Sequence, residues 1–245
     1  MKKKILLVLG ARSDIGIAVA HRFAKEGFQI QLAARNSSDL KNDCDNISLR
    51  FNVKTSFHEF DALNYNSHES FIEDLPNLPT VVISAFGCLG KQKESEKYLT
   101  KALEVIRTNY EGVISIFESF ANHFKSRGSG TLIGISSVAG DRGRGSNYIY
   151  GSAKAGLSTF LSGLRNRLYP FGVDVITIKP GYVRTKMTSE LQLPQYLTTN
   201  PNYVADCIFK AYRNKKGILY ITRIWFYIMK IIQIIPECLF KRMKL

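Results

Sequence analysis

Apolar residues along the chain fall into two patterns, short continuous runs and longer stretches with helical spacing. The run KILLVL near the N-terminus has the character of a strand buried on both faces of a sheet. Similar runs predict strands at residues 4–9, 29–33, 80–85, 130–135, 174–179 and 217–221, and a further strand ending near Asp61. Helical spacing fills the intervals, notably residues 15–26, 102–123 and 149–168. This alternation predicts an α/β fold: a single doubly wound parallel sheet of about seven strands with helices on both faces.

Residues 222–245 differ from the rest, so we divide the chain into a main domain over 1–221 and a C-terminal tail. In the tail, helical spacing separates a face of Ile, Trp, Phe and Met from a stripe formed by Arg223, Tyr227, Lys230 and Ile234. Charges within the apolar stretch and the break at Pro236 disfavour a membrane-spanning helix. Two interpretations stay open: a basic amphipathic helix lying on a membrane surface, or a helix buried in a subunit interface.

Charge narrows the choice of partners. The net charge is 34 − 20 = +14, and residues 207–245 alone carry nine Lys or Arg against one acid, Glu237. Such a balance is typical of proteins that bind nucleic acid, an anionic membrane or an anionic substrate. No zinc-finger or RNA-binding signature accompanies it, so we expect no nucleic-acid partner.

The four cysteines and the N-terminus indicate the compartment. Cys44, Cys88, Cys207 and Cys238 lie far apart, with neither disulfide nor metal-ligand spacing, so we expect reduced thiols and no metal site. The N-terminus MKKKILLVLG has a basic start, but its apolar run is too short for a signal peptide. These features favour the cytoplasm.

A glycine-containing turn follows the first predicted strand directly and opens a helix. Glycines at such a turn allow the backbone to approach a pyrophosphate, whose charge favours a helix N-terminus. This position predicts a Rossmann-type dinucleotide site in the main domain. Its residues would be Gly10, Arg12, Ser13, Asp14, Ile15 and Gly16.

The end of the second strand indicates which dinucleotide binds. An acid there would hold the ribose 2′-hydroxyl of NAD, whereas an arginine suits the 2′-phosphate of NADP. Ala34 occupies the position of the acid and Arg35 follows it, while Arg12 adds a second cation. The sequence therefore favours NADPH over NADH.

The segment ISSVAGDRGRGSNYIYGSAKAG carries the candidate catalytic residues. Tyr150 and Lys154 are four residues apart on a predicted helix, and Ser137 lies just after the fifth strand. A free tyrosine has a pKa near 10, and a nearby ammonium and the positive nicotinamide of an oxidised cofactor would lower it. A serine hydroxyl can polarise and orient a carbonyl oxygen.

Together these motifs resemble the short-chain dehydrogenase/reductase family over nearly the whole chain. The resemblance implies that Tyr150 protonates a reduced carbonyl oxygen, and that Lys154 binds the nicotinamide ribose and lowers the tyrosine pKa. It also implies that Asn109 in TNYEG positions a water in the proton relay. Members are commonly oligomers, so we expect a homo-oligomer. The resemblance further assigns cofactor contacts to Asp61, Ala85, Gly87, Pro180, Gly181, Val183 and Thr185.

Two departures from the family pattern concern cofactor binding. Asp14 replaces the middle glycine of the turn, and its carboxylate could cap the helix or narrow the pyrophosphate pocket. The segment 84–87 reads Ser-Ala-Phe-Gly in place of the usual Asn-Asn-Ala-Gly. The end of the fourth strand must therefore be stabilised differently.

Several segments, including FDALNYNSHES, SAFG and KPGYVRTKM, are similar to the decaprenylphosphoryl-2-keto-ribose reductase branch of the family. That resemblance implies hydride reduction of a polyprenyl-phosphate-linked keto-sugar in cell-envelope polysaccharide synthesis, at the cytoplasmic face of the membrane. Arg142 and Arg144 could hold the substrate phosphate, or lie in a solvated loop. The alternatives are a soluble reductase of another carbonyl, such as a ketoacyl thioester or a small sugar, and a non-catalytic NADP-binding protein.

Overall fold

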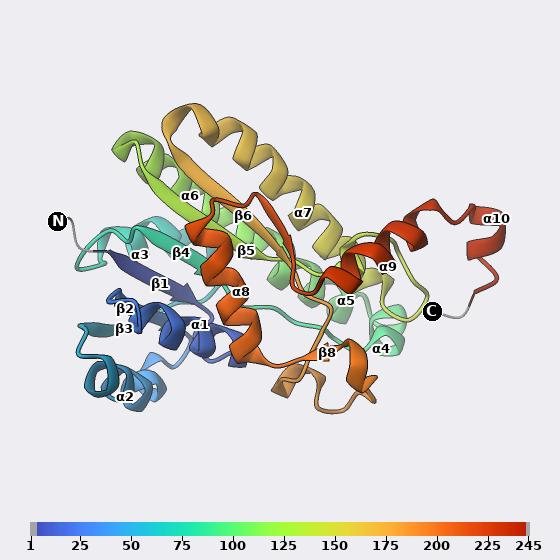
Figure 1. Ribbon diagram of the computed structural model, residues 1–245, viewed down its shortest axis with the longest axis horizontal. Coiled ribbons are helices and arrows are strands. Elements are labelled where there is room, and N and C mark those ends of the chain that lie inside the picture. The colour runs from blue at the N-terminus through green and yellow to red at the C-terminus, as the bar shows by residue number, and fades with distance from the viewer. Residues whose placement is uncertain (1–3, 244–245) are drawn as a thin grey trace.

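The computed structural model describes residues 4–243 and contains one large parallel sheet (Figure 1). Its strand order is β3-β2-β1-β4-β5-β6-β9, which confirms the predicted doubly wound sheet of seven strands. The predicted main domain starts at residue 1 and the predicted tail ends at residue 245, and both of these ends (residues 1–3 and 244–245) lie outside the described residues. The strands are β1 (Ile5–Leu9), β2 (Gln29–Ala34), β3 (Thr55–Glu59), β4 (Val81–Ser84), β5 (Gly130–Ile135), β6 (Val173–Lys179) and β9 (Ile218–Tyr220).

The alternation of side chains along β1 explains why helices cover both faces of the sheet. Leu6 and Val8 point into one apolar layer, Leu7 and Leu9 into the other, and all four are fully buried. The first layer is closed by α1 (Asp14–Ala24), α2 (Lys41–Phe51) and α8 (Pro201–Arg213). The second is closed by α3 (His68–Glu73), α6 (Gly112–Arg127) and α7 (Tyr148–Leu168).

The long helix predicted over 102–123 is interrupted in the structure. After α4 (Gln92–Lys97), the chain forms α5 (Leu99–Ile106), a π-helical turn at Arg107–Glu111, and then α6. Apolar spacing continues across all three segments, which is why the pattern predicts one helix. A π turn inserts a residue without breaking the helix, and such turns are frequent at functional sites.

The C-terminal segment forms two helices, α9 (Arg223–Ile234) and α10 (Glu237–Phe240), separated at Pro236. We refer to residues 223–243 as the arm, because they extend beyond the body of the molecule (Figure 1). Near its base, β7 (Tyr182–Val183) pairs with β8 (Thr198–Thr199) as a small separate sheet. No helix within residues 4–243 is both long and apolar enough to cross a membrane.

The strand order changes direction at β1, which pairs with β2 on one side and with β4 on the other. Connections on the two sides of such a point leave along opposite faces and open a crevice at the carboxyl ends of the strands. The glycine turn after β1, the end of β4 and the end of β5 all reach this edge of the sheet.

Candidate active site

A cavity of about 340 Å³ lies at the carboxyl ends of the strands, beside a larger cleft of about 1240 Å³. The two share walls formed by the glycine turn and by the segment after β4. The structure brings nearly all of the predicted site residues to these walls; only Gly16 and Arg142 are not among them. The cavity is lined by Arg12, Ser13, Asp14, Ile15, Ala85, Gly87, Asn109, Ser137, Arg144, Tyr150, Lys154, Pro180, Gly181, Val183 and Thr185. Gly10, Arg35 and Asp61 line the cleft.

The turn after β1 depends on its two glycines. Gly10 has a φ of +82°, and a Cβ there would lie 2.6 Å from the backbone nitrogen of Phe86. A Cβ on Gly16 would lie 2.9 Å from Oγ of Ser13. That same Oγ accepts a hydrogen bond of 2.9 Å from the backbone N–H of Gly16 and so caps α1. The turn therefore brings bare backbone to the helix N-terminus, as a pyrophosphate site requires.

Asp14 does not cap the helix, which was one of the two roles considered for it from the sequence alone, and it lines the cavity. The helix cap is Ser13, and the Asp14 carboxylate instead accepts a hydrogen bond of 2.7 Å from the backbone N–H of Lys186. Lys186 belongs to the segment after β7, which forms another wall of the cavity. The replacement of glycine by aspartate therefore ties two walls of the site together.

Two guanidinium groups lie at the end of β2, where the sequence predicts a phosphate site. Arg12 pairs with Asp39 at 3.1 Å and also donates to the carbonyl oxygen of Arg35 at 3.5 Å. Arg35 and Asp61 both line the cleft. The side chains of Arg12 and Asp39 are each about half exposed, so solvent weakens their pairing and leaves Arg12 available to an anion.

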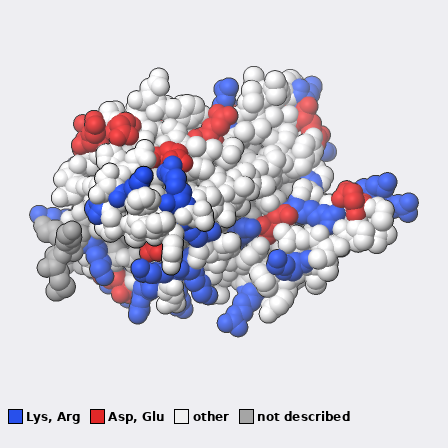
Figure 2. Space-filling model, turned by 90° about the horizontal axis from the view of Figure 1, so that it is seen from above, with Lys and Arg blue, Asp and Glu red and all other residues white. Residues whose placement is uncertain are grey.

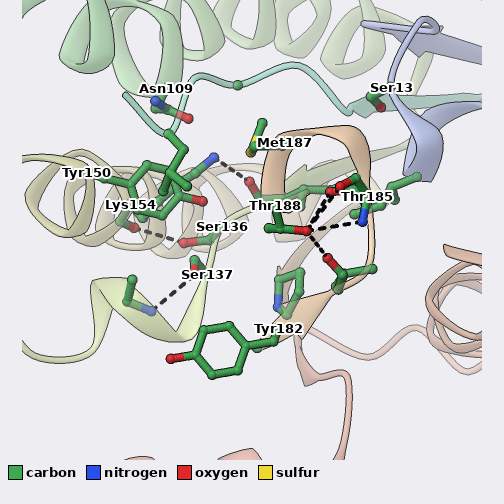
Figure 3. A pocket seen from close by; sticks show the side chains of 18 of the residues that line it. Ser13, Asn109, Ser136, Ser137, Tyr150, Lys154, Tyr182, Thr185, Met187 and Thr188 are labelled. Carbon is green, nitrogen blue, oxygen red and sulfur yellow. Dashed lines mark hydrogen bonds between the residues drawn. The ribbon is translucent and has the colours of Figure 1, made fainter. Parts of the chain in front are cut away.

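Tyr150 and Lys154 extend from α7 toward Ser137, which follows β5 (Figure 3). The ammonium Nζ of Lys154 lies 5.7 Å from the ring centroid of Tyr150 and donates 2.9 Å to the carbonyl oxygen of Ile135. Oγ of Ser137 accepts from the backbone N–H of Ala139 at 3.1 Å, which fixes the turn after β5. The helical spacing thus places a phenol, an ammonium and a hydroxyl on one cavity wall.

Burial moves the pKa values of this pair in opposite directions. Desolvation raises the pKa of Tyr150 to about 12, and a hydrogen bond with Ser137 opposes that rise. Desolvation lowers the pKa of Lys154 to about 7. The structure therefore shows the tyrosine pKa raised, where the sequence led us to expect it lowered, because desolvation outweighs the hydrogen bond with Ser137.

Asn109 lies in the π-helical turn and is fully buried. Its amide nitrogen donates to the carbonyl oxygens of Cys88 at 2.6 Å and Val105 at 2.8 Å, and its Oδ1 accepts from the N–H of Cys88 at 3.3 Å. A Cβ on Gly87 would lie 2.8 Å from that Oδ1. Asn109 therefore holds the segment after β4, which explains how this strand end is stabilised without the usual asparagines.

Trp225 is a cavity residue that sequence reasoning missed. The pattern places it on the apolar face of the tail helix, and the structure buries that side chain against the body of the same chain: only 4% of Trp225 is exposed. Its Nε1 donates to the carbonyl oxygen of Leu197 at 3.2 Å, and its ring meets that of Tyr182 edge to face. A Cβ on Gly181 would overlap the indole, so the glycine of the Pro-Gly turn leaves the space into which Trp225 packs.

The two arginines of the loop after β5 separate in the structure. Arg144 lines the cavity, and its Nε is buried without a hydrogen-bond partner among the described residues. Arg142 points to the arm instead, where it donates at 2.6 Å to the carbonyl oxygens of both Ile232 and Ile235. Other cavity residues come from irregular segments whose spacing carries no signal: Leu89, Asn147, Met187 and Leu191.

The chain is similar over nearly its whole length to known oxidoreductases. The family model for short chain dehydrogenase matches residues 4–195. An uncharacterized oxidoreductase of Mycobacterium tuberculosis is 33% identical over 242 residues, or 97% of this chain and 96% of that protein. The structure of a short-chain dehydrogenase from Sphingobium yanoikuyae in complex with NADPH has a TM-score of 0.83 at 20% identity, covering 96% of this chain and 97% of that one. A short chain dehydrogenase from Burkholderia cenocepacia in complex with NADP also has a TM-score of 0.83, at 19% identity, covering 98% and 97%. The chain therefore belongs to the short-chain dehydrogenase family of oxidoreductases.

Proposed function

We propose that this protein is an NADPH-dependent reductase that converts a keto group to an alcohol, with Tyr150 as the proton donor. The observation that carries the proposal is the shared cavity. The turn suited to a dinucleotide and the group of Ser137, Tyr150 and Lys154 open onto the same space. A carbonyl placed there would lie between the donor of a hydride and the donor of a proton.

The residues at the carboxyl edge fit NADPH. The bare backbone at Gly10 and the capped N-terminus of α1 would hold the pyrophosphate. Arg12 and Arg35 would contact the 2′-phosphate, and the absence of an acid at Ala34 removes the group that would prefer NADH. The NADPH and NADP held by the two similar structures support this choice. When bound, the cofactor supplies the hydride that reduces the carbonyl carbon.

The remaining chemistry belongs to the side chains of this chain. The Ser137 hydroxyl would donate to the carbonyl oxygen, which polarises the group and fixes its orientation. Tyr150, whose pKa burial raises to about 12, carries its proton at neutral pH and gives it to the oxygen as the carbon is reduced. The phenolate left behind would favour the charged form of Lys154, whose Nζ lies 5.7 Å from the centre of the Tyr150 ring, because opposite charges at short range stabilise each other.

For the substrate, we propose a polyprenyl-phosphate-linked keto-sugar, reduced during cell-envelope polysaccharide synthesis at the cytoplasmic face of the membrane. The cavity wall is mainly apolar, with Leu89, Val138, Met187, Leu191 and Trp225 among its residues. Arg144 and Asn147 each add a buried polar atom without a partner among the described residues. An anionic group on an otherwise apolar substrate would satisfy the guanidinium of Arg144.

The test measures NADPH oxidation with a polyprenyl-phosphate keto-sugar. Tyr150→Phe removes the proton donor and should lower kcat by about a hundredfold or more. Arg144→Ala should lower kcat/KM by about tenfold or more for the phosphorylated substrate. It should leave turnover of a neutral ketone nearly unchanged.

Arg213→Gln is the matched control, since it removes an exposed arginine of α8 outside the cavity. Full activity of Tyr150→Phe would contradict the proposed chemistry. Equal effects of Arg144→Ala on charged and neutral substrates would contradict the proposed substrate while leaving the reductase in place.

A further inference from the structure

Helix α9 has two apolar faces. Its inner face carries Trp225 and Met229, which are buried against the body beside Val138. A surface helix of a globular protein ordinarily has one apolar stripe, turned toward the core. The second stripe of α9 faces away from the body and comprises Ile224, Tyr227, Ile231 and Ile234.

This outer stripe is well exposed and extends past the end of α9. Its four residues follow a spacing of three, four and three, so they lie on one side of the helix. Ile231 is 60% exposed and Ile234 is 77% exposed. Leu239 and Met243 continue the exposed apolar surface along the rest of the arm.

Basic side chains flank this apolar stripe. Figure 2 shows Lys and Arg along the arm, with little acid among them. The acid on the arm, Glu237, is paired with Arg142 of the body at 2.9 Å. The exposed cations of the arm include Arg223, Lys230, Lys241 and Arg242.

The outer half of the arm is held against the body by Arg142, so the stripe has a defined orientation. Arg142 satisfies carbonyl groups at the C-terminal end of α9 and stacks on the ring of Phe240 with its carbon Cζ 3.7 Å from the centroid. Beside it, the buried carboxylate of Asp141 pairs with Lys179 and accepts 2.7 Å from the hydroxyl of Tyr220. The side chain of Gln233 also donates to the backbone of Asp141 at 3.4 Å.

We propose that the arm, residues 223–243, is a docking surface for an anionic lipid bilayer. An apolar stripe with basic flanks matches the acyl boundary and the negative headgroups of such a surface. A second copy of the chain is a poorer match, because two symmetric arms would bring their uncompensated cations together.

The arm lies beside the cavity, so docking of the arm would also position the cavity relative to the bilayer. Trp225 lines the cavity from the inner face of α9, while its neighbour Ile224 belongs to the outer stripe. A docked arm therefore sets the cavity beside the lipid surface. That advantage rests on the proposed lipid-linked substrate, but the docking itself does not require any particular substrate.

The experiment is flotation of the purified full chain with vesicles, without substrate or cofactor. One set of vesicles contains phosphatidylcholine alone, and the other contains phosphatidylcholine with phosphatidylglycerol. We expect the protein to float with the anionic vesicles and added salt to reduce the bound fraction. For the double variant Ile231→Glu, Ile234→Glu, the affinity for the anionic vesicles should fall by about tenfold or more, because the variant places two negative charges in the apolar stripe.

Leu49→Glu is the matched control, since Leu49 on α2 is 86% exposed and lies outside the arm. It should float as well as the unmodified chain. Equal flotation of the double variant, or no flotation of the unmodified chain, would overturn the docking proposal. So would light scattering that shows the double variant dissociating an oligomer, since the stripe would then be a subunit interface. NADPH oxidation with a neutral ketone is measured in parallel, so a failed docking is told apart from a failed reductase.

Discussion

Lys154 is buried beside Tyr150, which is itself partly buried on the wall of the cavity. Only 3% of Lys154 is exposed, and its ammonium has a backbone carbonyl as its hydrogen-bond partner, with no carboxylate paired to it in the described structure. A buried amine without a counter-charge loses its proton more easily, which is why the pKa falls to about 7. For the phenol the same burial favours the neutral form. At neutral pH Tyr150 therefore carries the proton that the proposed reaction requires.

This burial has a stability consequence that Lys154→Met should reveal. The folded pKa of Lys154, about 7, lies below its ordinary value of 10.5, so the unfolded chain binds the proton more tightly between these two values. The resulting destabilisation is complete below pH 7 and disappears as the pH rises toward 10.5. We expect Lys154→Met to raise the Tm by roughly 5 °C at pH 7 while abolishing activity.

Thermal unfolding followed by circular dichroism from pH 6.5 to 9.5 checks this prediction. The gain in Tm of the variant over the unmodified chain should shrink as the pH rises. A gain that stays constant with pH would show that the methionine improves packing and that the buried ammonium costs nothing. A lower Tm at every pH would show that the lost hydrogen bond to Ile135 dominates.

Among the elements, the strands could be predicted from the sequence and several connections could not. Strands buried on both faces require continuous apolar runs, so their positions are visible without knowledge of their neighbours. The π-helical turn contains Asn109, whose side chain donates hydrogen bonds to Cys88 and Val105, and Cys88 comes from another part of the chain. Helical spacing alone is compatible with a straight helix at that position.

The same limit explains which site residues could be predicted. Tyr150 and Lys154 are neighbours on one helix, and Gly10 follows its strand directly, so short-range spacing is enough to find them. Trp225 reaches the cavity only because α9 folds back over Gly181, a contact between distant parts of the chain. Arg142 and Arg144 look equivalent in the sequence, and only the position of the arm distinguishes them.

Arg142→Ala should increase local opening of the arm without unfolding the body of the protein. Arg142 joins the loop after β5 to the carbonyl ends of α9, and hydrogen bonds from a charged donor stabilise by about 1.5–3 kcal/mol each. Loss of this link should speed amide exchange in the second half of α9 and in α10 by about tenfold or more. Exchange in β1 and β4 should stay unchanged.

Hydrogen exchange read by mass spectrometry measures this effect. Lys241→Ala serves as the control, since it removes an exposed cation from the arm without breaking the contacts of Arg142. Unchanged protection of α9 in Arg142→Ala would show that Trp225 and Met229 hold the arm on their own. Faster exchange in the central strands would show that the arm supports the whole fold.

For the whole molecule, the arrangement of the apolar clusters predicts what happens when the chain ends at residue 221. The two large clusters on either side of the sheet contain no residue of the arm. A third, smaller cluster joins Trp225 and Met229 to Val138. Removal of residues 222–245 should therefore leave a chain that still unfolds cooperatively, because both faces of the sheet remain covered.

The shortened chain should keep most of its affinity for NADPH, since Gly10, Arg12 and Arg35 all precede the cut. It should lose substrate selection, because the indole of Trp225 forms part of the cavity wall. Fluorescence titration should find Kd for NADPH within about threefold of the full chain, whereas kcat/KM for the carbonyl substrate should fall about tenfold or more. A shortened chain that binds NADPH weakly or melts without cooperativity would mean that residues 1–221 are not an independent domain. Retained kcat/KM would mean that the arm closes the cavity without contacting the substrate, and its role would then lie entirely on its outer face.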